Sequence, residues 1–183
     1  MERSNPKITN NGLLHGKVGT YALMLHSPHQ RSIEIGKLGK MNVRKGFYVY
    51  VGSAFGSGGL VARIKHHFRI SESFHWHIDY LRSAVEITEV WCSHDPIKRE
   101  HEWASIFMGV HGVKLPLKGF GSTDCNCNSH LFFFSIPPSM KMFRKRIEQA
   151  IPNHHRIERI DGNALKVLFF CYYLYSPDFL FME

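Results

Sequence analysis

The run Phe47-Tyr-Val-Tyr-Val51, the link Gly52-Ser-Ala-Phe-Gly-Ser-Gly-Gly59 and the segment Leu60-Val-Ala-Arg-Ile-Lys-His-His-Phe68 decide the fold of this chain. The first run is rich in β-branched and aromatic residues, which favour a strand. Because side chains alternate along a strand, one face would be core and the other would present the phenols of Tyr48 and Tyr50. The glycine-rich link then ends the strand, and a different secondary-structure element follows it.

The segment after the link is predicted to be a helix, because its apolar residues recur at helical spacing. Arg63 and His67 lie four residues apart on one border of the apolar stripe. Before the strand, Thr20 to Leu25 and Ser32 to Ile35 are two further strand-like runs separated by a Ser-Pro-His-Gln turn. These two runs are expected to pair as a hairpin.

The elements after the helix complete a mixed α/β pattern. They are a short helix or turn at His75–Leu81, a strand at Val85–Trp91, a helix at about 97–110 and a buried final strand at Leu131–Ile136. The apolar face of the third of these is expected to carry Ile97, Ala104, Phe107 and Met108, with Glu100 inside it. We therefore expect an α+β fold: a small, largely antiparallel sheet of about four or five strands, flanked by helices.

The composition favours one globular domain that binds a polyanion. The chain has 183 residues, is 44% hydrophobic and carries a formal net charge of +8. A positive field of this kind attracts nucleic acid, although an anionic membrane surface would respond to it as well. The N-terminus has no apolar signal core, and four cysteines imply no disulfide framework, so a cytoplasmic location is expected.

The expected organisation is a polar tail at residues 1–16, a domain at 17–137 and an extension of unknown role at 138–183. Lys141 to Arg146 is expected to form a basic amphipathic helix, which could contact a phosphate backbone or simply be solvated. The aromatic run from Val167 to Phe181 is too short and too interrupted to be a transmembrane helix.

Several motifs, taken in order, resemble those of the GIY-YIG nuclease superfamily. They are Gly19-Thr-Tyr21, Tyr50-Val-Gly52, Arg63 with His67, and an acidic residue on a later helix. The sequence is similar in particular to the branch called DUF123, through three runs: Gly46-Phe-Tyr-Val-Tyr-Val-Gly-Ser53, His75-Trp-His-Ile-Asp-Tyr-Leu81, and Gly119-Phe-Gly-Ser-Thr-Asp-Cys-Asn-Cys127 with Ser129-His-Leu131. Thr20 replaces the isoleucine that is usual in the first motif.

This resemblance implies a metal-dependent endonuclease, with DNA preferred to RNA as the substrate. Tyr21 would be the general base, activated by the field of Arg63, which would also bind a phosphate oxygen. Tyr50 would orient the attacking water or the phosphate, and His67 would shuttle protons. Taken singly, each of these residues could be ordinary sheet or helix packing, and the order of the motifs is what favours the catalytic interpretation.

The resemblance assigns Glu100 as the ligand of one Mg²⁺ or Mn²⁺, since such an ion prefers oxygen ligands and keeps several waters. Glu102 points largely away on the helical wheel. His101 follows Glu100 where the family often carries cysteine. Neighbours one apart on a helix do not face each other, so an ion pair of Glu100 with Lys98 or Arg99 is not expected, and the partner of Glu100 would be distant in sequence.

A loop with two cysteines is a further candidate metal site. Cys125, Cys127 and His130 suggest structural Zn²⁺, with His75, His77 and Asp124 as further candidate ligands. Cys-x-Cys is tighter than the spacing common in zinc sites, and no second cysteine pair completes a tetrahedron. A packed turn is therefore favoured over zinc.

Two other functions remain open. A degenerate GIY-YIG fold could bind nucleic acid or a protein without cutting, and a zinc-dependent structural module would unfold on chelation. The motifs do not choose between branched and linear substrates.

Overall fold

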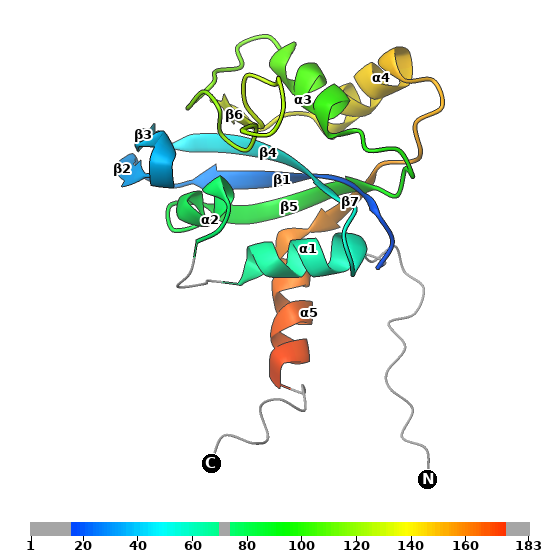
Figure 1. Ribbon diagram of the computed structural model, residues 1–183, viewed down its shortest axis with the longest axis horizontal. Coiled ribbons are helices and arrows are strands. Elements are labelled where there is room, and N and C mark those ends of the chain that lie inside the picture. Colours follow the sequence, from blue (N-terminus) through cyan, green and yellow to red (C-terminus); the bar gives the residue numbers. More distant parts are fainter. Residues whose placement is uncertain (1–15, 70–73, 175–183) are drawn as a thin grey trace.

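The computed structural model describes residues 16–69 and 74–174, and its centre is a five-stranded antiparallel sheet of order β6-β4-β1-β5-β7 (Figure 1). The middle strand β1 (Gly19–Ser27) pairs with β4 (Gly46–Ala54) on one side and with β5 (Glu86–Ser93) on the other. The outer strands are β6 (Leu131–Phe134) and β7 (Glu158–Asp161). The expected α+β fold with a largely antiparallel sheet is confirmed.

The hairpin expected between the first two runs is wrong. Strand β2 (Arg31–Glu34) pairs instead with β3 (Lys40–Val43) in a separate two-stranded sheet, joined through a short 3₁₀ helix at Gly36–Leu38. Both edges of β1 are taken by longer, more apolar strands, whereas β2 is mostly exposed. Burial of apolar side chains on both faces therefore selected the partners of β1.

The strand at Leu131–Phe134 is not the last strand of the sheet. Strand β7 pairs with β5, although it comes after residue 137, where the expected domain ended. Its sequence, Glu-Arg-Ile-Asp, has one apolar residue and was not recognisable as a strand by alternation. The packed unit thus continues beyond the double proline that follows β6.

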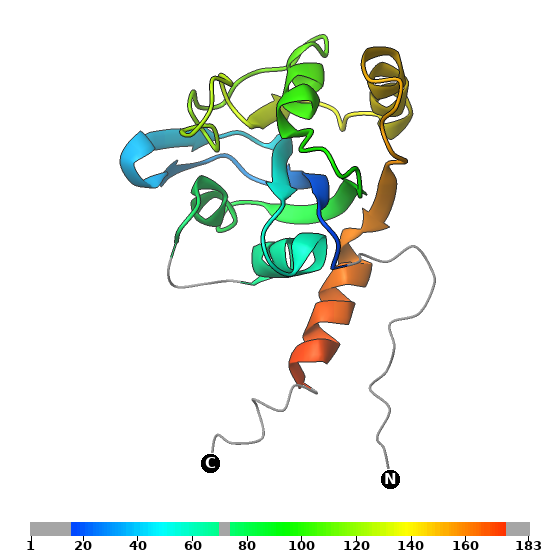
Figure 2. The same ribbon diagram turned by 45° about the vertical axis from the view of Figure 1, so that its right-hand side comes forward.

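Helices cover both faces of the sheet (Figures 1 and 2). On one face lie α1 (Gly59–Phe68), α2 (His77–Leu81) and α5 (Gly162–Leu174), and on the other lie α3 (Glu100–Met108) and α4 (Met140–Ala150). Residues of β1 alternate between the two resulting cores, with Tyr21 in the first and Ala22 in the second. Tyr48 and Tyr50 lie in the first core and are 1% and 8% exposed, so the expectation that only the opposite face of this strand is core is wrong.

The helix expected at 97–110 begins three residues later, at Glu100. Ile97 precedes the helix and is exposed, and Met108 in its last turn is exposed too, so two of the four expected core positions are wrong. Ala104 and Phe107 are buried as expected, together with Trp103. Across residues 16–69 and 74–174, every helix, α5 included, falls short of the length and apolar character needed to cross a membrane.

Candidate active site

The centre of the site is a buried hydrogen bond between β1 and α1. Tyr21 Oη lies 2.7 Å from His67 Nε2, and the two residues are 1% and 2% exposed. Gly52 is directly opposite Tyr21 in the pairing of β1 with β4, and a Cβ there would lie 2.5 Å from Tyr21 Oη. The glycine of Tyr50-Val-Gly52 therefore makes room for the phenol that binds His67.

Tyr50 lies beside this pair and is covered by the loop that precedes β6. Its ring contacts those of His67 and Phe120 edge to face, with centroids 6.1 Å apart in each case. Gly121 has φ +69°, and a Cβ there would come 2.9 Å from the ring of Tyr50. The backbone N–H of Gly121 donates to His77 Nδ1 at 3.0 Å, which fixes the loop against α2. Position 121 thus needs glycine for its conformation and for its contact.

Arg63 lies at the edge of the cluster. Its guanidinium stacks over the ring of Trp76 at 4.3 Å, and that ring also contacts His67. Asp79 holds Trp76 in place by accepting its backbone N–H at 2.9 Å. Among the described residues no carboxylate forms an ion pair with Arg63, so its donors remain available for an anion.

Burial sets the protonation of the three central groups. It raises the pKa of Tyr21 well above 10.0, helped by Tyr50 and opposed by the charge of Arg63. It likewise raises the pKa of Tyr50, again opposed by Arg63. The pKa of His67 is lowered well below 6.5 by burial and by the nearby charges of His66 and Arg63. At neutral pH the pair is therefore a phenol and a neutral imidazole.

Glu100 is the first residue of α3 and is 8% exposed, so its expected burial is confirmed. The expectation that no near neighbour pairs with it is wrong: Lys98 Nζ lies 2.6 Å from Glu100 Oε1. Helical spacing does not govern this contact, because Lys98 precedes the helix and its backbone is free to turn back. The charge of Glu100 raises the pKa of both Tyr21 and Tyr50, which places it within electrostatic reach of the phenols.

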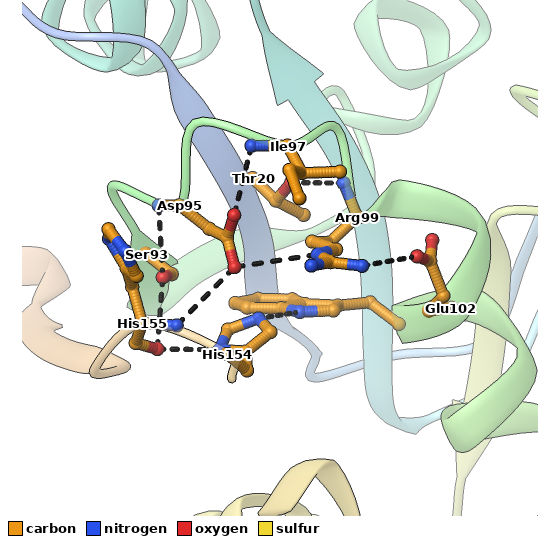
Figure 3. Close-up of polar contacts among 9 residues, drawn as sticks. Thr20, Ser93, Asp95, Ile97, Arg99, Glu102, His154 and His155 are labelled. Atoms are coloured by element: carbon orange, nitrogen blue, oxygen red, sulfur yellow. Dashed lines mark hydrogen bonds and ion pairs between the residues drawn. The ribbon is translucent and has the colours of Figure 1, made fainter. Parts of the chain in front are cut away.

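A polar network fixes the start of α3 (Figure 3). The carboxylate of the buried Asp95 accepts from the backbone N–H of Ile97 at 2.9 Å and from Arg99 Nε at 3.4 Å. Arg99 also donates from its backbone N–H to Thr20 Oγ1 at 3.0 Å. Thr20, which directly precedes Tyr21 on β1, thus ties the residue before Glu100 to this strand.

The implied Mg²⁺ or Mn²⁺ fits Glu100 as a site with a single carboxylate. Lys98 binds Oε1, while Oε2 has no hydrogen bond or ion pair with the rest of the described chain. A magnesium ion that keeps most of its waters needs little more than one such oxygen. Glu102 is half-exposed and paired with Arg99 at 3.1 Å, so it is engaged elsewhere.

The cysteine loop differs from its expected form. Four donor atoms, from His101, Cys125, Cys127 and His130, all lie within 4.8 Å of one another. The sequence has no second cysteine pair, but His101 supplies a fourth donor that was not among the expected candidates. A signal was present in the sequence, since histidine is a common zinc ligand and His101 directly follows Glu100.

The other expected members of that loop site lie outside the cluster. His75 and Asp124 are exposed, and His77 accepts the backbone hydrogen bond of Gly121. None of the three is among the four converging donors.

Comparison with protein families shows that a model described as domain of unknown function DUF123 matches residues 20–152. Searches of curated proteins and of solved structures find no match.

Proposed function

The chain belongs to the DUF123 family, whose model covers most of it, and on this premise we propose that it is a metal-dependent endonuclease that hydrolyses phosphodiester bonds. The proposed substrate is nucleic acid, DNA in preference to RNA, and the proposed location is the cytoplasm. The proposed mechanism is of the GIY-YIG type that the sequence motifs resemble.

One observation carries the proposal: Tyr21, Tyr50, Arg63, His67 and Glu100 converge from four separate elements. Tyr21 and His67 are hydrogen-bonded, and the rings of Tyr50 and His67 are in contact. The charges of Arg63 and Glu100 both act on the two phenols. Chance packing of strand aromatics does not explain why a buried glutamate and an arginine without a carboxylate partner among the described residues join them.

In the proposed reaction Tyr21 takes a proton from water while it passes its own proton to His67. A free phenolate is disfavoured because burial raises the pKa of Tyr21, so the two transfers would occur together. His67 is neutral and already hydrogen-bonded to Tyr21, and because its pKa is lowered it would hold the proton only transiently. Arg63 would bind a nonbridging phosphate oxygen with its fork of donors, and Tyr50 would position the water.

Glu100 would hold the divalent ion. A bound Mg²⁺ or Mn²⁺ supplies positive charge that offsets the charge developing on the phosphate. Lys98, which forms an ion pair with Oε1 of Glu100, would stay close enough to add a second positive charge near the leaving oxygen.

The test is a cleavage assay on linear, flapped and branched DNA and RNA, with Mg²⁺, Mn²⁺ or chelator. We expect metal-dependent cleavage by the wild type and a loss of about a hundredfold or more in Glu100→Gln. Glu102→Gln is the matched control, because it is two residues away on the same helix and should keep most activity. Loss in Glu102→Gln with full activity in Glu100→Gln would show that the wrong carboxylate was chosen.

The low exposure of Tyr21 and Tyr50 supports a second candidate, a module that binds nucleic acid or protein without cutting it. A general base must meet the water it deprotonates, and these phenols are covered. Binding by the wild type with no cleavage of any substrate in the panel would favour this second function.

A further inference from the structure

We propose that His101, Cys125, Cys127 and His130 form a tetrahedral zinc site that fastens the loop before β6 to helix α3. The site goes beyond the proposed nuclease activity and does not depend on it. Its ligands come from two places in the chain, the first turn of α3 and the loop at 119–130.

Two of the distances between the donor atoms suit zinc. His101 Nδ1 lies 3.3 Å from Cys127 Sγ, and Cys125 Sγ lies 3.6 Å from His130 Nε2. Ligands bound at normal Zn–S and Zn–N lengths in a tetrahedron are separated by about 3.3–3.8 Å. All four donor atoms lie within 4.8 Å of one another, so one ion could bind at their centre once the more widely separated donors move closer.

The chemistry of the donors selects the metal. Thiolate and imidazole ligands favour Zn²⁺, whereas Mg²⁺ and Mn²⁺ prefer oxygen. Two thiolates and two neutral imidazoles bring two negative charges, so a Zn²⁺ ion would leave the cluster neutral. This donor set therefore differs from the single carboxylate of Glu100, and the two sites would take different metals.

The backbone around the cluster is already fixed as a structural site requires. The loop is closed at its base by the N–H of Gly119 donating to Asn128 O at 2.8 Å and the N–H of His130 donating to Phe120 O at 2.8 Å. His130 is held to β4 through the N–H of Val51, which donates to its carbonyl oxygen at 2.9 Å. The loop lies beside α3 in both views (Figures 1 and 2). A metal at its tip would join elements whose positions are set independently.

The ring of His101 connects this cluster to Glu100. Its Nδ1 lies 3.3 Å from Cys127 Sγ, and its Nε2 lies 3.8 Å from Glu100 Oε1. Histidines that bind a metal through one ring nitrogen commonly offer the other N–H to a carboxylate. The zinc would thus fix His101 beside Glu100, while remaining apart from the reacting groups.

The proposal is tested on untagged full-length protein, expressed with zinc and freed of loosely bound metal by a weak chelator. We expect one zinc per chain by elemental analysis. Replacement of zinc by cobalt should give the absorption of a tetrahedral Co²⁺ ion with thiolate ligands. In His101→Gln and Cys127→Ser, zinc affinity should fall at least tenfold. His75→Gln is the matched control and should keep its zinc, because His75 lies on the surface outside the cluster.

Measurements on the wild type keep the test decisive if a variant folds poorly. Chelation should lower the melting temperature of the wild type, and zinc should restore it. Wild-type protein that holds no zinc and gives no tetrahedral cobalt spectrum would overturn the proposal. So would His101→Gln with the zinc content of the wild type, or a Cys125–Cys127 disulfide in protein purified without oxygen. None of these readouts measures cleavage, so failure of the nuclease proposal would leave the result intact.

Discussion

At the scale of single residues, the hydrogen bond between Tyr21 and His67 decides what the site can do. His67 Nδ1 has no hydrogen-bond partner among the described residues, although it is buried. Such a group costs stability, and a role in proton transfer would account for its presence. Two substitutions separate that role from packing.

Tyr21→Phe keeps the ring and removes the hydroxyl. We expect cleavage to fall about a hundredfold or more, because the proton path through Tyr21 is lost, while binding of nucleic acid survives. Tyr48→Phe is the matched control: Tyr48 is equally buried on the same face, but its hydroxyl binds only the backbone of Arg44. The Tyr48→Phe variant should lose about 1 kcal/mol of stability and little activity. Single-turnover rates and chemical unfolding measure both effects, and equal loss of activity in the two variants would remove Tyr21 from the base role.

The lowered pKa of His67 predicts how stability depends on pH. In the unfolded chain the imidazole takes up a proton below about pH 6.5, whereas in the folded chain it stays neutral to a lower pH. The unfolded state therefore binds more protons, and stability should fall as pH drops below 6.5, by at most about 1.4 kcal/mol per pH unit from this group.

Urea unfolding of wild type and His67→Gln between pH 5 and 7.5 measures this contribution. The free energy of unfolding should change less steeply with pH in the variant than in the wild type. Some dependence on pH should remain, because burial also lowers the pKa of His77, His130 and His154. Tyr21→Phe keeps His67 and should keep the slope. Identical slopes in wild type and His67→Gln would contradict the prediction.

At the scale of elements, the placement of α3 depends on the network around Asp95. Burial raises the pKa of this carboxyl, but hydrogen bonds from the backbone of Ile97 and His155 and the charge of Arg99 outweigh it, so the pKa is lowered from 3.8. The carboxylate thereby joins the start of α3 to the segment before β7. The segment after residue 137 thus supports the helix that carries Glu100.

Asp95→Asn should lower the free energy of unfolding by about 1.5–3 kcal/mol at neutral pH, because it removes a buried charged acceptor with three donors. Glu102→Gln is the control: it loses another ion pair of Arg99, but a half-exposed one, for which about 0–1 kcal/mol is expected.

The pH dependence of that loss is a second check on Asp95. A lowered pKa contributes stability above pH 3.8, which is lost as pH falls through the folded value, so the difference between wild type and Asp95→Asn should shrink in acid. A difference that is constant with pH would show that shape, and not charge, matters at Asp95.

At the scale of the whole molecule, the net charge of +8 should govern encounter with nucleic acid. The basic helix α4 covers the face of the sheet opposite α1, and Arg144 and Arg146 already donate to the carbonyl oxygens of Ile157 and Gly109. We therefore expect the phosphate backbone to bind on the side of Arg63 and not on α4.

Binding of Glu100→Gln to one duplex should weaken steeply with salt, with a slope of log affinity against log salt of about −0.9 for each phosphate neutralised. Adding Arg63→Gln should reduce the slope by about one. The exposed pair on α4, changed as Lys141→Gln with Lys145→Gln, should leave it nearly unchanged. An affinity that does not change with salt would contradict the electrostatic account. A smaller salt dependence in the Lys141→Gln, Lys145→Gln variant would show that nucleic acid binds at α4.

The sequence by itself determined the elements whose local pattern is strong. Strand β4, helix α1 and the short helix after His75 were predicted because alternation, helical spacing and glycine breaks are local properties of the chain. The candidate residues Tyr21, Tyr50, Arg63, His67 and Glu100 were found from the order of short motifs, and the family match covers all of them. None of this required knowledge of which strands pair.

The tertiary structure decided what depends on contacts between distant residues. β1 pairs with β4 and β5, and β7 joins the sheet, because pairing follows the burial available on both faces and not the nearest turn. The phenols are covered because α1 and the loop at 119–130 pack over them. His101 meets Cys125, Cys127 and His130 only because the fold brings the first turn of α3 to the tip of that loop, a closeness that spacing along the chain does not encode.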